Sequence, residues 1–437
     1  MNKSHKIAYL INKYLGPDIK NISKKIYYRF GFLISILLNK KDQEEFSEIF
    51  KLKNLNLPNK NYASHFGYYD RTSISLTNRF LINTSYSEKD SNSSYIYIHN
   101  LKNLDNNKLF LKDPICYSRA HNIQQGNLIS WFTYKNQDAF IYNDIANYEL
   151  FSCMILLENN NLKKFKRFPL PVQVITPKLS KAISIDYFKL LNKRKEYSYV
   201  NKFNKNINFI SNVLYEFSLV NGDINFSISR KDLPNVRDNK GFLVNVDEIE
   251  NESWNLNHAM YSPSGKSFIF LLRIYDNKNR RISNLIYKDE TGKLKLIFSG
   301  IISHFCFIEE RKLFIWGDPR ESNFKHPQFF IYSLEDFSIQ SIDSLKQFND
   351  GHPTFSKKLS SIIFDSYPSF GRYSYLYLFN LKTFKVSKLL SVRIPPKYSG
   401  FNRIDLHPRF SHNGEYLTFD TYDHHLKKPV QAILEFI

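Results

Sequence analysis

The stretch His352-Pro-Thr-Phe-Ser356, followed by Ser361-Ile-Ile-Phe-Asp365, returns later as His407-Pro-Arg-Phe-Ser411 and Tyr416-Leu-Thr-Phe-Asp420. The two histidines and the two aspartates are separated by the same 55 positions (352 to 407 and 365 to 420). A repeat of this kind means that one structural unit is used more than once, with equivalent residues at equivalent places. The fold is therefore expected to be built from copies of this unit.

Further copies of the unit extend along the chain. A third copy is His258-Ala-Met-Tyr-Ser-Pro-Ser-Gly-Lys-Ser-Phe-Ile-Phe270, and more degenerate copies begin at Gly67, His121, Val174 and Ser303. This gives about seven units of roughly 40–60 residues, which is the size of the four-stranded blades of a β-propeller. An open solenoid would need a capping unit and usually has shorter repeats, so a closed propeller is the better interpretation.

The residues of one unit explain why it forms strands. Tyr261-Ser-Pro-Ser-Gly-Lys266 is a strand end followed by a tight turn, and the apolar run that begins at Phe268 is typical of a strand buried on both faces. Aromatic residues make up 16% of the chain, which favours strands over helices. A single blade cannot bury both faces alone, so neighbouring blades must stack. We expect an all-β, seven-bladed β-propeller over residues 61–437.

Residues 1–60 have a different pattern and predict a short helical N-terminal extension with a linker. Residues 19–52 contain stretches of helical period, and residues 53–60 are rich in Asn, Pro and Lys. The apolar run FGFLISILL (30–38) is too short to span a bilayer. Two interpretations remain open for this segment: a helix packed against the domain, or a basic helix resting on an anionic membrane surface.

The charge of the chain suggests acidic partners. The formal net charge is +20, which favours nucleic acid, anionic lipid or an anionic polysaccharide, unless the lysines simply form a solvated basic surface. No zinc-finger spacing, RRM signature or basic recognition helix is present, so nucleic acid is not expected. Cys116, Cys153 and Cys306 lie far apart and favour a reducing compartment. We expect a cytoplasmic protein that is peripheral to the inner membrane if its N-terminal segment binds lipid.

The repeat residues carry a family resemblance over residues 64–437. The pattern HPxFSxxGxxxxFD, with Gly67-Tyr-Tyr-Asp70 and His121-Asn-Ile-Gln-Gln-Gly126, resembles the TolB/WD40-like propellers that include oligogalacturonate lyase. It is more similar still to uncharacterised propellers of bacterial polysaccharide gene clusters.

The resemblance implies a divalent metal held at the channel mouth by histidines and a glutamine, where a histidine and an arginine assist β-elimination from a uronic acid. The residues of matching type are His258, His352, His407 and Gln125 (or Gln124) for the metal, with His121 and Arg409 beside them. The chain departs from the lyase because its histidines come from separate blades, and no His-x-His pair appears where the lyase has one.

Histidines at the starts of equivalent strands should gather at one pole of the channel. The set is His121, His258, His304, His352 and His407, with His65 or Asp70 at the place of the first blade. Imidazole with carboxylate and amide oxygens suits Mn, Zn or a similar divalent ion. These histidines are either a functional cluster or structural residues kept by the repeat.

The remaining roles follow from chemistry at such a pole. A neutral histidine or a tyrosine such as Tyr69 would remove a proton, and Arg409 and Arg119 would clamp a carboxylate. Asp365 and Asp420 either orient histidine ring nitrogens or satisfy local turns.

Two functions stay open. One is an enzyme acting on an acidic polysaccharide or oligosaccharide, most concretely a metal-assisted lyase. The other is a non-catalytic glycan-binding or assembly propeller for cell-envelope polysaccharide synthesis.

Overall fold

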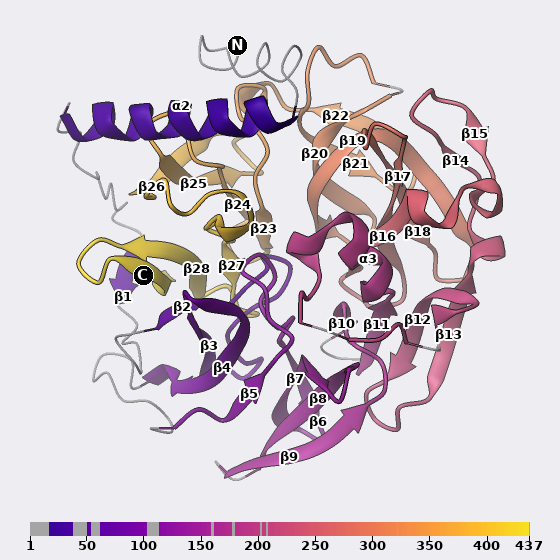
Figure 1. Cartoon of the computed structure of the whole chain (residues 1–437), viewed down its shortest axis with the longest axis horizontal. Coiled ribbons are helices and arrows are strands. Elements are labelled where there is room, and N and C mark those ends of the chain that lie inside the picture. Colours follow the sequence, from indigo (N-terminus) through magenta and orange to yellow (C-terminus); the bar gives the residue numbers. More distant parts are fainter. Residues whose placement is uncertain are drawn as a thin grey trace.

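The computed structural model describes residues 17–37, 50–53, 62–102, 113–158, 161–176, 180–201, 203–206, 209–320 and 322–436. Its strands form antiparallel sheets that stand around a common centre (Figure 1). The predicted all-β class is confirmed, since the described residues form 29 strands and two α-helices: α2 (Pro17–Leu37) and α3 (Tyr187–Lys193). No helix among these residues is both long and apolar enough to cross a membrane.

The first three sheets follow the chain in order, and each is made of four consecutive strands. The first contains β2 (Ala63–His65), β3 (Phe80–Ser87), β4 (Asp90–Asn100) and β5 (Cys116–Ser118). The second contains β6 (Ser130–Tyr134), β7 (Gln137–Ala146), β8 (Glu149–Glu158) and β9 (Asn161–Phe168). The third contains β10 (Val174–Thr176), β11 (Lys181–Ile185), β12 (Asn212–Ser218) and β13 (Ile224–Ser229). A two-stranded ribbon follows, β14 (Val236–Arg237) and β15 (Leu243–Val244).

The next sheet has seven strands because one long strand belongs to two successive groups. Its members are β16 (Trp254–Tyr261), β17 (Phe268–Tyr275), β18 (Arg281–Lys288), β19 (Leu294–Glu309), β20 (Lys312–Pro319), β21 (Gln328–Ser333) and β22 (Ile339–Ser341). The first part of β19 pairs with β18 up to Gly300, and the part from Gly300 onward pairs with β20. Gly300 has a φ of +150°, and a Cβ there would lie 2.2 Å from the Asp318 carbonyl oxygen, so the crossing requires glycine.

The last two sheets complete the arrangement. One contains β23 (Pro353–Ser356), β24 (Ser361–Asp365), β25 (Tyr373–Asn380) and β26 (Val386–Arg393). The other contains β27 (Arg409–Phe410), β28 (Tyr416–Asp423) and β29 (Lys428–Phe436), with β1 (Phe50–Lys53) as its outer strand. Because β1 pairs with β29 in antiparallel register, a strand that precedes the first sheet joins the last strand of the chain in one sheet.

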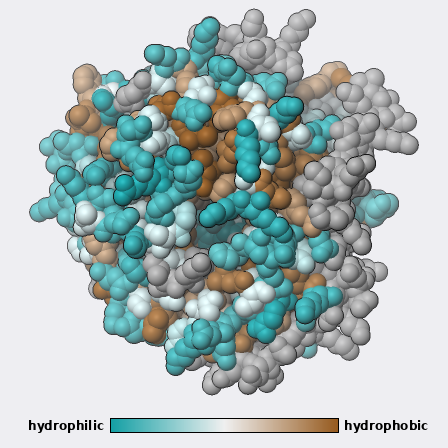
Figure 2. All heavy atoms as spheres, turned by 180° about the vertical axis from the view of Figure 1, so that it is seen from behind, coloured by the Kyte–Doolittle hydropathy of each residue, from teal (hydrophilic) through white to brown (hydrophobic). Residues whose placement is uncertain are grey.

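Apolar side chains fill the spaces between neighbouring sheets. Phe132 and Ile141 of the second sheet pack in one buried cluster with Phe217 of the third. Full burial of each such side chain stabilises the fold by about 1.5–3 kcal/mol. Figure 2 shows the molecule from behind, where hydrophobic residues gather near and above the centre and hydrophilic residues cover most of the left side.

Helix α2 lies across the outside of the sheet that contains β25 and β26 (Figure 1). Its inner face contacts the loop before β25: the Tyr27 and Phe370 rings are 4.5 Å apart, and a Cβ on Gly31 would lie 2.1 Å from the Phe370 carbonyl oxygen. Of the predicted apolar run 30–38, Leu38 lies outside the described residues, as do residues 54–60 of the predicted linker.

Candidate functional site

A cavity of about 420 Å³ occupies the centre of the ring of sheets. Each four-stranded sheet contributes a segment within or next to its innermost strand, and the seven-stranded sheet contributes two. The lining residues are Leu76 and those in the segments 69–72, 130–131, 174–176, 260–265, 306–307, 353–355 and 409–412. Residues just before these segments therefore meet at one end of the cavity.

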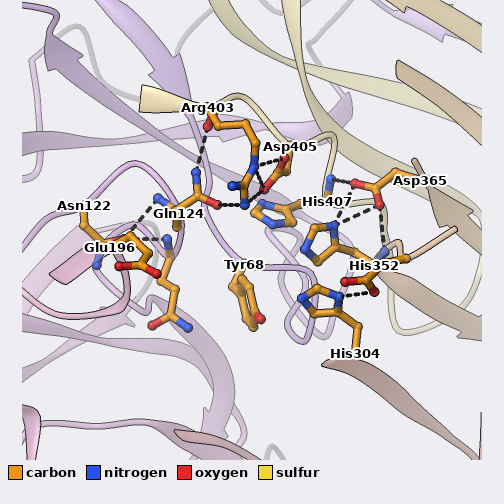
Figure 3. A network of polar contacts seen from close by, with 12 residues as sticks. Tyr68, Asn122, Gln124, Glu196, His304, His352, Asp365, Arg403, Asp405 and His407 are labelled. Atoms are coloured by element: carbon orange, nitrogen blue, oxygen red, sulfur yellow. Dashed lines mark hydrogen bonds and ion pairs between the residues drawn. The ribbon is translucent and has the colours of Figure 1, made fainter. Parts of the chain in front are cut away.

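Four of the predicted histidines meet there. His258, His304, His352 and His407 each precede a lining segment by one or two residues. The ring centroids are 5.7 Å apart for His258 and His304, 4.1 Å for His304 and His352, and 4.2 Å for His352 and His407. The Tyr68 ring lies within 5.0 Å of His258 and 5.2 Å of His407. Figure 3 shows His304, His352 and His407 on one side of Tyr68.

His121 does not occupy the equivalent position, which corrects the alignment of its repeat. Its Nε2 lies 2.7 Å from His65 Nε2, and its Nδ1 lies 2.6 Å from the Ser91 carbonyl oxygen. The residue two positions before the lining segment of that sheet is Leu128. It has the left-handed φ of 54° that His258 (61°) and His407 (45°) also have. Turn residues after His121 separate it from the strand, so a match of residue type had misplaced the start of this unit.

His258 is held between two tyrosines. Its Nδ1 lies 3.1 Å from the Tyr68 hydroxyl and its Nε2 lies 2.8 Å from the Tyr69 hydroxyl. The Tyr69 hydroxyl also lies 3.0 Å from the Phe305 carbonyl oxygen, to which it donates its one proton. His258 Nε2–H must then donate to Tyr69, while Nδ1 accepts from Tyr68. Burial, followed by the charge of His304, holds the pKa of His258 well below its usual range, which agrees with this neutral tautomer.

His352 is oriented by Asp365, as the sequence had suggested for that aspartate. His352 Nδ1 lies 2.9 Å from one Asp365 carboxylate oxygen and 3.0 Å from the other. The same carboxylate accepts the backbone N–H groups of His352 and His407. Burial opposes the charged imidazole, but Asp365 outweighs it and raises the pKa of His352 above its usual value. With Nδ1 engaged, Nε2 is the nitrogen left for a ligand.

His304 has a carboxylate partner that sequence reasoning missed. Its Nδ1 lies 2.8 Å from Asp350 Oδ1. Burial raises the pKa of Asp350 to about 6, while burial and the charge of His352 hold the pKa of His304 well below its usual range. His304 is therefore neutral at physiological pH, with Nδ1–H donated to Asp350.

Asp405 is the second missed carboxylate. His352, Asp405 and His407 each present a ligand atom, and these atoms lie within 4.8 Å of one another. Arg403 holds Asp405 through contacts of 2.6–2.8 Å, and its Nη2 donates to Gln124 Oε1 at 3.0 Å (Figure 3). A signal for both missed residues lies in the repeat, since Asp350-Gly-His352-Pro and Asp405-Leu-His407-Pro share one spacing. Alternate residues of an extended segment point to the same side.

The two predicted glutamines differ. Gln124 is engaged with Arg403, because its Nε2 also donates to the Arg403 carbonyl oxygen at 2.8 Å. Gln125 is 1% exposed, and neither its Oε1 nor its Nε2 has a hydrogen-bond partner among the described residues. His407 Nε2 is likewise buried without a partner. Orphaned buried polar atoms of this kind indicate a missing ligand, ion or water.

The predicted arginine clamp is not at this site. Arg409 is sealed in a buried ion pair with Asp420 at 2.9 Å, and it also donates to the Gly67 carbonyl oxygen. Asp420 therefore holds an arginine and not a histidine ring. Arg119 is exposed, and its backbone N–H donates to Asp144.

The chain resembles known proteins in fold but not in sequence. The chain matches no protein-family model, and no curated protein matches its sequence. The crystal structure of oligogalacturonate lyase from Vibrio parahaemolyticus aligns with a TM-score of 0.55 and 14% identity, over 90% of this chain and 95% of the lyase. The β-propeller domain of the Trilobed protease from Pyrococcus furiosus aligns with a TM-score of 0.44 and 9% identity, over 84% of this chain and 95% of that domain. The chain is a β-propeller.

Proposed function

We propose that this propeller acts on an acidic polysaccharide or oligosaccharide at the histidine end of its cavity, by metal-assisted β-elimination. The observation that carries the proposal is the group His352, Asp405 and His407, with His407 Nε2 buried and without a partner. The fold similarity to oligogalacturonate lyase supports a carbohydrate substrate.

The residues present fit a divalent metal. Two imidazoles and one carboxylate suit Mn or Zn, and Asp365 orients the His352 ring as partners of metal-bound histidines do. When bound, such a metal polarises a substrate carboxylate and acidifies the proton on the adjacent carbon. Gln125 would supply an amide oxygen as a further metal ligand. His258 would not be a ligand, because tyrosines already engage both of its ring nitrogens.

The proton acceptor in this proposal is His304. Asp350 takes its Nδ1–H, so the lone pair on Nε2 is free to accept a proton, and the ring is already neutral. His121 and Arg119 have no part in this step, because His121 pairs with His65 and Arg119 is exposed elsewhere. Tyr69 holds His258 in place.

The number of blades belongs to the same proposal. If β19 serves as the outer strand of one blade and the inner strand of the next, the seven-stranded sheet is two blades and the ring has seven. The seven lining segments of the cavity support this count.

A second candidate function is a non-catalytic glycan-binding or assembly propeller. It is favoured by burial: the four clustered histidines are only 1–3% exposed, so a substrate must enter a nearly closed site. A binding module would need only the outer rim of this end.

Elemental analysis of the purified protein, together with a screen of uronic-acid polymers for ultraviolet-absorbing unsaturated products, tests the two functions. The lyase requires bound metal and product formation. Product without metal would refute the metal-assisted step, and metal-free protein that binds but does not cleave these polymers would favour the binding module.

We also propose that α2 rests on an anionic membrane surface. Its outer face exposes Ile26, Phe30, Leu33 and Ile36 at fractions of 63%, 61%, 58% and 46%, spaced as one helical stripe. The helix contains four basic residues and one acidic residue, Asp18. Basic charge beside an apolar stripe fits anionic lipid. The stripe then holds the propeller at the membrane.

A further inference from the structure

Arg273 is a buried arginine without a partner. The residue is 3% exposed, and its Nε and Nη1 atoms are buried without a hydrogen-bond partner among the described residues. A buried charge without a partner is strongly unfavourable, and each unsatisfied donor adds to the penalty. Buried donors of this kind indicate a missing ligand, ion or water.

The strand register places a second arginine beside it. In β17 and β18, Arg273 stands opposite Ser283 and Tyr275 stands opposite Arg281. Opposite residues of an antiparallel pair share a face, so the two arginines are diagonal neighbours on one face. Asn255, opposite Arg273 in β16, has an unsatisfied Oδ1 and donates to the Tyr275 hydroxyl. This end of the blade face is polar, although the same face carries apolar residues such as Leu271 further along.

The charge around these arginines is not balanced. A third arginine, Arg194, pairs with Glu196, and its Nη1 is unsatisfied. Asp350, whose charge acts on Arg281, is engaged by His304. Burial, followed by the charges of Arg281 and Arg194, lowers the pKa of Arg273 to about 9. The guanidinium groups therefore repel one another without an anion between them.

We propose that Arg273 and Arg281 form a binding site for the carboxylate of an acidic sugar. The planar fork of a guanidinium pairs two donors with two carboxylate oxygens. Arg273 acts on the histidine end, since its charge adds to the effect of burial and neighbouring histidines on the pKa of His258 and His304. The site thus takes the clamp role that the sequence had suggested for Arg409.

The Arg281 part of the site is open to the outer side, whereas Arg273 lies buried behind it. Arg281 is exposed and lines a surface pocket of about 290 Å³ together with Gly300, Asp318 and Arg320. The Asp318 carboxylate accepts from Ser322 Oγ. The identification of the anion as a sugar carboxylate rests on the proposed function, whereas the need for an anion rests on Arg273 alone.

The first test measures the Tm of the ligand-free protein. Replacing an unpaired buried charge by an apolar side chain of similar length removes its desolvation penalty. The variant Arg273→Met should therefore raise the Tm of the ligand-free protein, by roughly 2 °C. Arg409→Met is the contrast, because it leaves Asp420 unpaired and should lower the Tm. A lower Tm for Arg273→Met as well would show that Arg273 supports the fold and would overturn the inference.

The second test uses galacturonate, with galactose as its neutral counterpart and phosphate at equal ionic strength. Isothermal titration should show galacturonate binding that weakens by about tenfold to a hundredfold in Arg273→Gln, because a hydrogen bond to a charged group is lost. The exposed Arg280→Gln should bind as the wild type does. Galactose binding equally well, phosphate alone binding, or an unchanged affinity in Arg273→Gln would each overturn the inference. Metal content and polymer cleavage are measured separately, so a metal-free protein with Arg273-dependent binding would refute the proposed function and leave this site standing.

Discussion

His352 and His407 differ in the hydrogen bonds of their ring nitrogens, and we expect their alanine variants to differ in stability. His407→Ala removes an unsatisfied buried nitrogen, and His352→Ala removes a ring held by Asp365. Both should abolish bound metal, measured by elemental analysis. His407→Ala should change the free energy of unfolding by no more than about 1–2 kcal/mol, since lost packing is offset by removal of the orphaned atom. The exposed His326→Ala is the control and should keep the metal. Metal-free wild type with destabilised variants would make these histidines structural.

Asp420 is a buried charge with a partner, Arg409, so its loss should destabilise the fold, in contrast to the loss of Arg273. Asp420→Asn would leave Arg409 buried without a counter-charge and would weaken the contacts to the backbone N–H groups of Phe66 and Gly67. The free energy of unfolding, measured by urea denaturation, should fall by about 3–5 kcal/mol. A loss below about 1 kcal/mol would mean that the pair is screened by water.

The pair His65 and His121 predicts a pH dependence. Burial is the main cause that lowers the pKa of each ring to about 3, so below pH 6.5 the unfolded chain binds protons that the folded chain does not. Stability therefore rises with pH between about 3 and 6.5 and is lost on acidification. By pH 5 each histidine should cost about 2 kcal/mol. His121→Gln should flatten the decline of Tm over this window, and an unchanged slope would contradict the assignment.

At the scale of elements, α2 offers a direct test of its exposed stripe. The double variant Phe30→Ser and Leu33→Ser should weaken binding to phosphatidylglycerol vesicles by about tenfold or more, because two apolar side chains no longer enter the membrane interface. Co-sedimentation with phosphatidylcholine vesicles serves as the neutral comparison. Phe337→Ser removes a similarly exposed ring (52%) from the turn between β21 and β22, outside α2, and should bind as the wild type does. Equal loss in both variants would contradict the α2 surface.

The strands could be predicted from the sequence, whereas several residues of the candidate sites could not. The alternating strands and the His-Pro repeat predicted an all-β propeller, because periodic burial and turn residues are local signals. The place of His121 could not be read the same way, since Leu128, which takes the equivalent left-handed position, shares no chemistry with histidine. Arg273 was equally hidden, because a charged residue in an apolar strand such as FIFLLRIY gives no sign of its partner. Pairings such as Asp420 with Arg409 depend on side-chain packing that a single sequence does not record.

At the scale of the whole molecule, one sheet joins distant parts of the chain. Strand β1 is separated from β29 by nearly the full sequence, yet the two pair over Phe50–Lys53. The other described sheets of the ring are built from consecutive strands. Opening the β1 pairing therefore frees a sheet edge and also removes the tie between the first and last sheets, whereas opening an outer strand elsewhere frees an edge only.

This difference can be measured with proline in two outer strands. Leu52→Pro lies in β1 and Gln340→Pro lies in β22, and both replace a strand residue that pairs at the sheet edge. Proline removes a backbone donor in either strand, so the local losses are alike. Leu52→Pro should lower the Tm by several degrees more than Gln340→Pro and should accelerate hydrogen exchange throughout β28 and β29, since ring closure is lost along with the edge. If the two variants lose equal stability, and exchange quickens only next to each proline, then packing between the sheets holds the ring closed without β1.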